Sequence, residues 1–257
     1  MGLMTFKGGV HPFEGKDLSK DKPIRELLPK GELVYPLSQH IGAPATPIVA
    51  VGDTVLKGQK IAEAGGFVSA PIHASVSGTV KKIEPRRVPT GDMVNSIVIE
   101  SDGEFNEVEY QAVEDVSALS KEEIINRIKE AGVVGMGGAG FPTHVKLSPK
   151  EPEKIDYIIA NCAECEPYLT SDYRIMLDHT EELVEGMRII LSMFEHAKGV
   201  FAVENNKPDC IAKLLELTKD EPRMEVAPLM TKYPQGGERQ LIYAVTKRAI
   251  NSKMLPA

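Results

Sequence analysis

The chain has 257 residues, of which 42% are hydrophobic and 26% are charged, so it can bury one large core or two ordinary ones and is not a disordered chain. Its net charge is −7, which argues against nucleic acid as the main partner. No window reaches the roughly 18 apolar residues of a membrane span, and the first residues hold no apolar signal core. We therefore expect a soluble, cytoplasmic chain, and three cysteines agree with a reducing compartment.

The first half of the chain is rich in glycine and proline and carries short β-type runs. Turn signals such as Val51-Gly52-Asp53 and Ser77-Gly78 separate the runs, a pattern typical of a small all-β sandwich or barrel. The expected strands are residues 32–35, 46–51, 60–62, 78–83 and 96–101.

The pattern changes after Ser117. Ser120 and Glu123 form a capping box, and the apolar stripe that follows ends at Gly132. Strand-type and helix-type segments then alternate, which predicts a parallel, right-handed βαβαβ sheet in a Rossmann-like three-layer α/β domain. The expected strands are residues 155–160, 200–204 and 224–229, and the expected helices are residues 180–198, 208–219 and 238–248. We place the boundary near residues 103–117, which gives domains of residues 1–115 and 116–257.

In parallel sheets of this kind, ligands bind beyond the carboxyl ends of the strands. Three loops leave those ends, at residues 161–172, 205–208 and 231–237. We therefore expect these loops to converge on one crevice.

The β-rich half resembles a biotinyl/lipoyl carrier domain, a barrel-sandwich hybrid, through VGDTV at residues 51–55 and SGTV at residues 77–80. A true carrier attaches its cofactor to a lysine on the central hairpin, but no lysine lies between Ile61 and Val80. A docking or structural β-domain is therefore favoured over a carrier. His73 lies in this hairpin, and a surface or hydrogen-bonded histidine is favoured there over a metal ligand.

Glycine is densest in the segment GMGGAGFPT at residues 135–143. Gly135, Gly137 and Gly140 satisfy G-x-G-x-x-G, but the motif follows a predicted helix and not the strand that a dinucleotide fold requires. Glycines at this density still let backbone N–H groups approach an anion, and Lys146 could add a charge for a phosphate. The alternative is a plain linker.

The segment NCAECEP leaves the first strand of the α/β domain and contains a C-x-x-C pair, Cys162 and Cys165. Zinc would need two more ligands, and a thioredoxin-type pair would open a helix, so unremarkable thiols are favoured. Glu164 and Glu166 are better candidates, because carboxylates accept strong hydrogen bonds from hydroxyl and amide groups of a ligand. Solvated glutamates are the alternative.

The loop after the third strand contains Tyr233 and the pair Gly236-Gly237 before the last helix. A Gly-Gly pair at a helix N-terminus suits an anion or cofactor contact, and Tyr233 offers an aromatic face for stacking. A simple turn or packing is the alternative for each of these residues alone.

Three long stretches together resemble a known family: GMGGAGFPTHVKL, NCAECEPYLTSDYR and TKYPQGGERQLIYAV. They are similar to RnfC, the C subunit of the Rnf complex, a membrane-associated ferredoxin:NAD oxidoreductase. The opening FKGGVHPFEGK and the β-domain are similar to the same subunit. The middle region also resembles the NADH-binding flavoprotein subunit of respiratory complex I.

The RnfC resemblance implies an NADH-oxidising flavoprotein that holds FMN in the crevice. Electrons would pass between NAD(H) and ferredoxin, coupled to ion translocation. The implied partners are other Rnf subunits at the membrane and, indirectly, ferredoxin, and the implied location is peripheral on the cytoplasmic side. No catalytic side chain and no metal ligand is implied, because the chemistry belongs to the cofactor.

Carried over by position, the resemblance implies two groups of site residues. The FMN contacts would be Gly135, Gly137, Gly138, Lys146, Asn161, Glu164 and Gly236. The NADH contacts would be Phe141, Glu166, Tyr233 and Glu238. The sequence departs from the complex I pattern at Met136, Leu147, Ala163 and Gly237, which weakens the transfer of complex I details but follows the Rnf pattern.

Family members continue into iron–sulfur motifs, and three cysteines outside C-x-x-C-x-x-C order cannot hold such clusters. The chain is therefore expected to be an N-terminal fragment, with 4Fe-4S clusters only in the region that it lacks. The alternative function is a non-catalytic docking fragment of an RnfC-like electron-transfer protein, such as a cobalamin reductase or a proline reductase partner.

Overall fold

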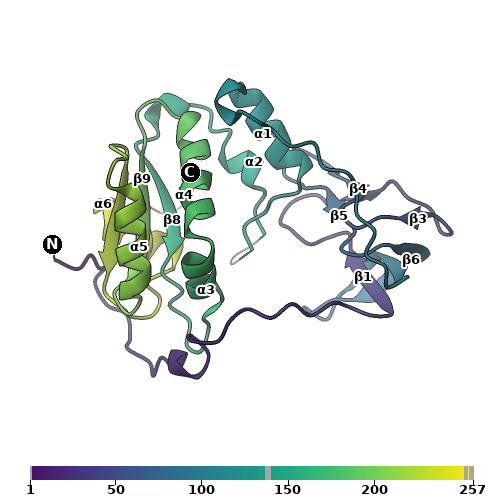
Figure 1. Ribbon diagram of the computed structural model, residues 1–257, viewed down its shortest axis with the longest axis horizontal. Coiled ribbons are helices and arrows are strands. Elements are labelled where there is room, and N and C mark those ends of the chain that lie inside the picture. The colour runs from purple at the N-terminus through teal and green to yellow at the C-terminus, as the bar shows by residue number, and fades with distance from the viewer. Residues whose placement is uncertain (1, 137–139, 252–253, 255–257) are drawn as a thin grey trace. The chain divides into compact units, whose positions relative to one another are not determined.

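The computed structural model describes residues 2–136, 140–251 and 254. It contains two compact units (Figure 1): an α/β unit of Met1–Arg25 and Glu151–Ala257, and a β-unit of Glu26–Lys150. The limits of these two units differ from the predicted domain limits, residues 1–115 and 116–257. The predicted domain limits remain a prediction. Each unit is described separately.

The β-unit contains two antiparallel sheets, with strand orders β1-β7-β6-β3 and β2-β4-β5. The strands are β1 Glu32–Pro36, β2 Thr46–Pro47, β3 Thr54–Val55, β4 Lys60–Glu63, β5 Ile72–His73, β6 Gly78–Arg87 and β7 Met93–Ser101. Val55, Ile61, Val80, Ile97 and Ile99 are fully buried in the core between them. Residues 32–101 therefore form the all-β domain that the turn spacing predicted.

Two details of the β-unit differ from the sequence prediction. The strand expected at residues 46–51 ends at Pro47, because the chain turns at residues 50–53, where Ala50 and Asp53 bond to each other. The two-residue strands β3 and β5 were not predicted, since a run of two residues shows no alternation of polar and apolar side chains.

The first helix of the predicted second half belongs to the β-unit. Helix α1, Lys121–Glu130, begins at the expected capping box, in which Ser120 and Glu123 bond to each other's backbone N–H groups. At its end, Glu130 accepts a 2.6 Å hydrogen bond from Lys60 of β4. A short helix, α2 Thr143–Lys146, follows the glycine-rich segment.

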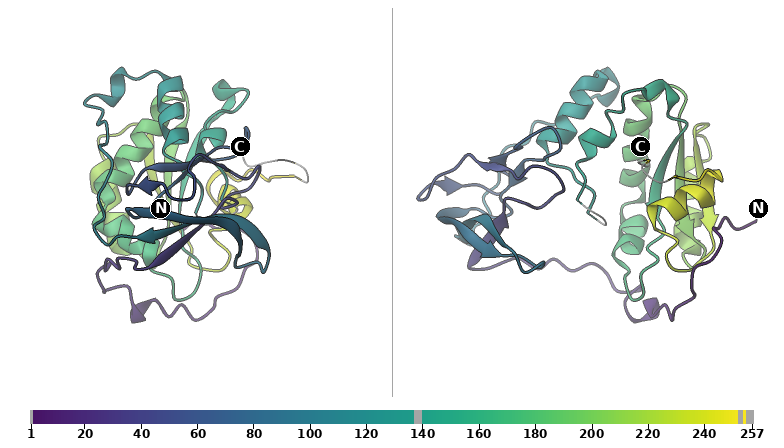
Figure 2. Two further views of the ribbon diagram at one scale, coloured as in Figure 1. Left: turned by 90° about the vertical axis from the view of Figure 1, so that its right-hand side faces the viewer. Right: turned by 180° about the vertical axis from the view of Figure 1, so that it is seen from behind.

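The α/β unit is built on a parallel sheet of order β10-β9-β8. Its elements are β8 Tyr157–Cys162, α3 Ser171–Asp178, α4 Thr180–Ser192, β9 Lys198–Glu204, α5 Pro208–Thr218, β10 Met224–Leu229 and α6 Glu238–Thr246. Gly199 faces Met187 and Leu191 of α4, whereas Ala202 packs with Leu241 of α6. Because strand residues alternate between faces, α4 and α6 cover opposite faces, as Figure 2 shows. The predicted three-layer arrangement is confirmed.

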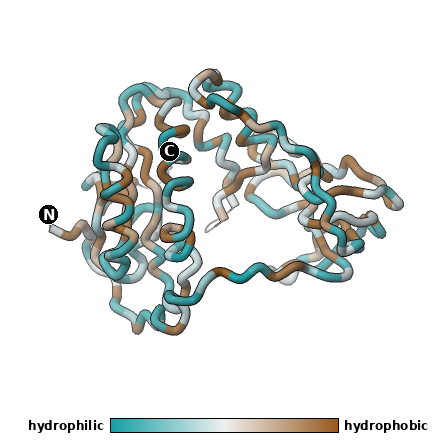
Figure 3. The backbone as a smooth tube through the Cα atoms, viewed as in Figure 1, coloured by the Kyte–Doolittle hydropathy of each residue, from teal (hydrophilic) through white to brown (hydrophobic). Residues whose placement is uncertain are grey.

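Hydropathy follows these layers. In Figure 3 the tube of α5 alternates between hydrophobic and hydrophilic residues, the pattern of a helix with one buried face. Leu214 of α5 and Phe201 of β9 are fully buried, whereas Leu215 is 50% exposed. This packing fixes the strands whose carboxyl ends carry the candidate site.

The helix expected at residues 180–198 is shorter than predicted. It ends at Ser192, and the chain then turns toward β9. The guanidinium of Arg223 donates to the carbonyl oxygens of Leu191, Phe194 and Ala197, so a side chain distant in sequence satisfies the backbone after the helix end. Helix α3 was not predicted: the loop expected at residues 161–172 includes its first two residues, and its remaining residues were assigned to no element.

The first 25 residues belong to the α/β unit and not to the β-unit, although they precede the β-domain in the sequence and the domain limit predicted at residue 115 includes them with it. Met4 forms a β-bridge with Leu229 at the edge of β10, and Val10 forms one with Tyr233. We call residues 4–20 the N-terminal segment. It crosses the loops at the carboxyl ends of the sheet.

Candidate functional site

Two of the predicted site loops meet at the carboxyl edge of the α/β sheet. Asn161, near the end of β8, donates its side-chain amide to the carbonyl oxygen of Gly236 at 2.8 Å. The N–H of Gly236 in turn donates to the sulfur of Cys165 at 3.2 Å. The predicted contact between the segment after β8 and the Gly236-Gly237 turn is therefore present.

Glycine at position 236 has a steric reason. A Cβ atom there would lie 3.3 Å from the Cys165 sulfur and 3.4 Å from Ala163 Cβ, closer than most such contacts in proteins. The small residue lets the turn approach the acidic loop, by which we mean residues 163–170 between β8 and α3.

Glu164 is buried and its carboxylate already has protein partners. It accepts hydrogen bonds from the N–H groups of Asp172 at 2.7 Å and Tyr173 at 3.3 Å, two residues in the first turn of α3. These bonds satisfy donors that a helix start leaves free, and the negative charge is favourable there. The predicted FMN contact of Glu164 stays a prediction, and the structure adds a capping role that sequence reasoning missed.

The predicted NADH contacts of this unit, Glu166, Tyr233 and Glu238, all expose their side chains. Glu238 is the first residue of α6, and no side chain among the described residues caps that helix N-terminus. Exposed carboxylates, an aromatic ring and uncapped backbone donors can together bind a polar nucleotide.

A buried charged network lies beneath these loops. Glu204 at the end of β9 and Lys207 before α5 are 0% and 1% exposed, with 3.6 Å between Glu204 Oε2 and Lys207 Nζ. Lys207 also donates to the carbonyl oxygen of Ala163 at 2.6 Å. Burial raises the pKa of Glu204 to about 7 and lowers the pKa of Lys207, because removal from water disfavours each charge.

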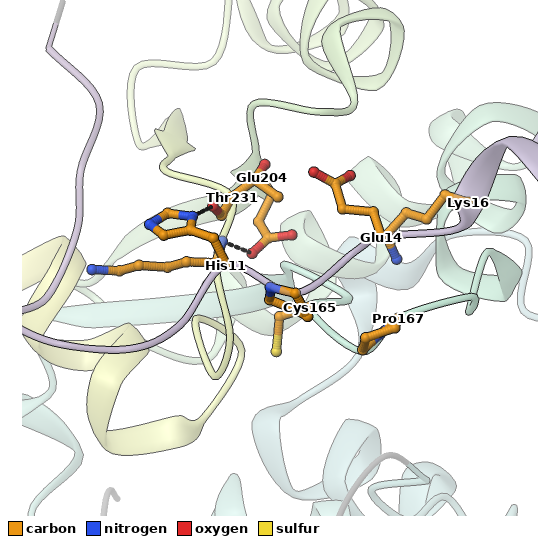
Figure 4. Close-up of a pocket in the computed structure, with 9 residues that line it drawn as sticks. His11, Glu14, Lys16, Cys165, Pro167, Glu204 and Thr231 are labelled. Atoms are coloured by element: carbon orange, nitrogen blue, oxygen red, sulfur yellow. Dashed lines mark hydrogen bonds between the residues drawn. The ribbon is translucent and has the colours of Figure 1, made fainter.

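A small pocket opens beside this network (Figure 4). Figure 4 shows Glu204 near His11, whose ring nitrogen Nδ1 lies 3.1 Å from the Thr231 carbonyl oxygen. Lys232 donates its backbone N–H to Glu204 at 3.2 Å, and within the described part of the chain the other carboxylate oxygen, Oε2, has no hydrogen-bond partner. The lining residues are His11, Pro12, Glu14, Lys16, Cys165, Pro167, Glu204, Thr231 and Lys232.

Four charged residues of this edge, Lys16, Glu204, Lys207 and Lys232, did not appear among the predicted site residues. Glu204 and Lys207 flank the short loop between β9 and α5 and are three residues apart. An acidic and a basic residue at this spacing are the one local signal that indicates an ion pair here. Lys16 and Lys232 reach partners in other parts of the chain, which no local pattern shows.

The cysteines of the C-x-x-C pair are buried and free. Burial raises the pKa of Cys162 to about 12 and also raises that of Cys165, so both thiols are protonated at neutral pH and are poor nucleophiles. Within residues 2–136, 140–251 and 254, no group of three or more His, Cys, Asp or Glu side chains could hold a metal ion.

The glycine-rich segment lies in the β-unit. The N–H of Gly135 donates to the carbonyl oxygen of Phe141 at 2.9 Å, which closes the base of the loop. Gly140 has φ +63°, and a Cβ there would lie 2.9 Å from His40 Cα, so this position requires glycine. Lys146 is exposed, with its Nζ 5.9 Å from the centre of the Phe141 ring.

The remaining predicted glycines, Gly137 and Gly138, lie outside the described residues. The glycine-rich segment of residues 135–143, from here on the glycine loop, and the Gly236-Gly237 turn belong to different units, so their predicted meeting in one crevice stays a prediction. No helix in the described part of the chain is both long and apolar enough to cross a membrane.

Comparison with known proteins gives two family matches. Residues 128–257 match the model described as the Nuo51 FMN-binding domain, and residues 4–104 match the RnfC barrel sandwich hybrid domain. These matches agree with the fold of an all-β domain followed by an α/β domain.

Curated relatives match along almost the whole chain. The C subunit of the Na(+)-translocating ferredoxin:NAD(+) oxidoreductase complex of Acetobacterium woodii is 45% identical over 98% of this chain and 57% of that protein. The C subunit of the proton-translocating ferredoxin:NAD(+) oxidoreductase complex of Clostridium ljungdahlii is 45% identical over 99% of this chain and 56% of that protein. The C subunit of the ion-translocating oxidoreductase complex of Haemophilus influenzae is 39% identical over 95% of this chain and 38% of that protein.

The chain thus spans between 38% and 57% of the length of these relatives. The matched ranges include both parts of the candidate site, the glycine loop and the three loops at the carboxyl edge. The chain belongs to the Nuo51 FMN-binding domain family, and it carries an RnfC barrel sandwich hybrid domain ahead of that domain.

Proposed function

We propose that this chain is the NADH-oxidising flavoprotein part of an Rnf electron transport complex. The observation that carries the proposal is the convergence of Asn161, Gly236 and the acidic loop at the carboxyl edge of a parallel sheet, in a chain that belongs to an FMN-binding family. The relatives' names support a role in electron transfer between ferredoxin and NAD(H), coupled to ion movement.

The residues of this edge fit a flavin nucleotide. Asn161 bonds to the Gly236 turn, and its side chain is exposed. The turn leads into the N-terminus of α6, which no described side chain caps. FMN would be held by Gly135, Gly137, Gly138, Lys146, Asn161, Glu164 and Gly236, and NADH by Phe141, Glu166, Tyr233 and Glu238. Bound FMN would accept two electrons as hydride from NADH and pass them on singly. The protein side chains would orient the two nucleotides.

The proposed partners follow from the relatives, which are subunits of multi-subunit complexes. We propose that this chain docks to other Rnf subunits on the cytoplasmic side of the membrane and reaches ferredoxin indirectly. Its three cysteines do not follow the C-x-x-C-x-x-C order of an iron–sulfur motif, so we place the 4Fe-4S clusters of the proposed electron path outside the described residues.

Flavin titration tests the proposal. The chain is titrated with FMN while flavin fluorescence is followed, and NADH is then added without oxygen to see whether the visible absorbance of oxidised flavin disappears. Lys146→Ala should weaken FMN binding by about 1–3 kcal/mol, the value of a charged hydrogen bond. Lys150→Ala, an exposed lysine four residues on, is the matched control.

The outcomes separate two functions. Saturable FMN binding and bleaching by NADH support the flavoprotein. A folded chain that binds no FMN would favour the non-catalytic docking role. Equal FMN affinity in Lys146→Ala and the wild type would show that Lys146 does not contact FMN, although the chain binds it.

A further inference from the structure

Lys16 of the N-terminal segment reaches into the acidic loop in the way that a bound cation would. Its Nζ donates to the carbonyl oxygens of Glu164 at 2.8 Å, Glu166 at 3.1 Å and Leu169 at 2.7 Å. It also lies 3.9 Å from the Glu164 carboxylate. An ammonium group has three N–H donors, and all three have an acceptor here. Lys16 is itself only 8% exposed.

The acidic loop needs such a contact because its backbone is strained. Glu164 and Tyr168 have φ values of +47° and +68°, a region that residues other than glycine rarely occupy. Such conformations persist where surrounding contacts hold them. The carbonyl oxygens that point at Lys16 Nζ would also repel one another without a positive charge between them.

Contacts of the residues around Lys16 fix its backbone against the acidic loop. The N–H of Tyr168 donates to the carbonyl oxygen of Glu14 at 2.7 Å. The Tyr168 ring lies over Gly15, where a Cβ atom would be 2.3 Å from the ring. Ser19 and Thr170 share a hydrogen bond of 2.9 Å between their hydroxyl groups. The lysine is therefore fixed at its Cα end as well as at its ammonium group.

The same loop carries Glu166, whose side chain is exposed while its carbonyl oxygen binds Lys16. We infer that Lys16 is a positioning residue, which holds the acidic loop in the conformation that presents the Glu166 carboxylate to the nicotinamide nucleotide. This inference rests on the proposed function. Lys16 does not itself contact the nucleotide, and it acts through the backbone of residues 164–169.

The test compares Lys16→Met with Lys20→Met in the full 257-residue chain. Methionine keeps most of the apolar stem of Lys16 and removes the charge and the donors. Lys20 lies in the same segment, but its ammonium group pairs with Asp17 and Asp21 and not with the acidic loop. Circular dichroism first checks that each variant folds. If Lys16→Met does not fold, Lys16→Gln, which keeps two donors, takes its place.

The first readout needs no bound nucleotide. Amide hydrogen exchange of peptides that cover residues 163–170 should be at least about tenfold faster in Lys16→Met, because the loop opens locally without its ammonium contacts. Exchange in β9 should not change, and Lys20→Met should match the wild type throughout. Unchanged exchange of residues 163–170 in Lys16→Met would overturn the inference.

The second readout uses the chain loaded with FMN and a soluble dye as electron acceptor. The KM for NADH should rise roughly tenfold while kcat changes less than about threefold, since Lys16 serves nucleotide binding and not the hydride step. In a Glu166→Ala background, Lys16→Met should raise KM by less than about twofold, because the two residues act through one carboxylate. Additive effects of the two substitutions, or an unchanged KM in Lys16→Met, would overturn the inference.

The two readouts also separate this inference from the proposed function. If the wild-type chain oxidises no NADH with FMN present, the proposed function fails, and hydrogen exchange alone decides whether Lys16 holds the loop. If the wild type is active and exchange and KM are the same in Lys16→Met and Lys20→Met, the inference fails and the proposed function stands.

Discussion

The acidic loop and the glycine loop were both expected to bind a cofactor, but the protein uses them differently. In the acidic loop, the Glu164 carboxylate and several carbonyl oxygens are engaged by α3 and Lys16. In the glycine loop, the Gly135 N–H closes the loop base while Lys146 remains exposed. The first loop is shaped by buried charges, whereas the second requires glycine at Gly140, and the exposed charge of Lys146 follows it in α2.

The difference shows that residue type alone does not identify a binding residue. Glu164 and Glu166 are two positions apart and carry the same carboxylate, yet one is buried at a helix start and the other is exposed. Their distinct roles come from the local backbone and from Lys16, 148 and 150 residues away. Some residues fix the backbone of the loop, and others are free to contact a ligand. Predictions that separate these two kinds of residue test the comparison most directly.

The largest effect is expected at the buried pair beneath the acidic loop. Lys207→Met should destabilise the chain by about 3–5 kcal/mol at pH 8, because it leaves the Glu204 charge buried without its partner and removes the bond to Ala163. Urea unfolding measures the change. Lys219→Met, at an exposed pair with Glu216 whose side chains are 58% and 69% exposed, should cost less than about 1 kcal/mol. If Lys207→Met lowered the free energy of unfolding by a similarly small amount, the buried ion pair would not stabilise the carboxyl edge of the sheet.

The second prediction concerns pH. The pKa of Glu204 is raised to about 7 in the folded chain, against an ordinary value near 4.5, so the folded state binds the proton more tightly. The stability that Glu204 contributes is then present at pH 5 and lost as pH rises toward 8, by at most about 3 kcal/mol. Glu204→Gln should remove this loss, so its stability relative to the wild type should increase from pH 5 to pH 8.

The comparison with Glu204→Gln is needed because other groups titrate in the same range. The pKa values of His73 and His144 are lowered by burial, so these histidines stabilise the folded chain as pH rises, the opposite direction. Urea unfolding of both proteins at pH 5 and pH 8 isolates Glu204. A difference between the two proteins that is the same at both pH values would show that Glu204 does not titrate in this window.

The third prediction uses the two glutamates of the acidic loop as a matched pair. Glu164→Ala should destabilise the chain by about 1–3 kcal/mol, since it removes the acceptor at the start of α3 and leaves buried donors unsatisfied. Glu166→Ala should change stability by less than about 0.5 kcal/mol, as expected for an exposed site. Thermal unfolding ranks the two variants. An equal loss of stability in the two variants would contradict the view that Glu164 stabilises the fold and that Glu166 is free to contact a ligand.

Much of the α/β unit could be predicted from the sequence. Strand β10, residues 224–229, matches its predicted limits, and α5 begins at the expected Pro208, because apolar periodicity and proline are local signals. The convergence of the Gly236 turn on the segment after β8 also followed from the topology rule for parallel sheets. These features depend on residues that are neighbours in sequence or in the strand order.

The N-terminal segment could not be predicted in the same way. Residues 4–20 carry no long apolar repeat, and they join the α/β unit through two β-bridges and the ammonium of Lys16. Each of these contacts spans well over a hundred residues, so no local window contains both partners. No local signal therefore places residues 4–20 against the α/β unit, and none marks Lys16 as a residue beside the acidic loop.

The smallest effect is expected at the two cysteines of the acidic loop region. Cys162 and Cys165 are buried with raised pKa values, so their thiols are protonated and serve packing and one hydrogen bond. Replacing both by serine keeps an acceptor for the Gly236 N–H, and FMN affinity should stay within about tenfold, or about 1.4 kcal/mol. The double alanine variant, which lacks that acceptor, should bind FMN more weakly than the serine variant, because the Gly236 turn loses its link to the loop. FMN titration of both variants, with unfolding curves as a check on the fold, decides the question: loss of binding in a folded serine variant would place thiol chemistry in the site.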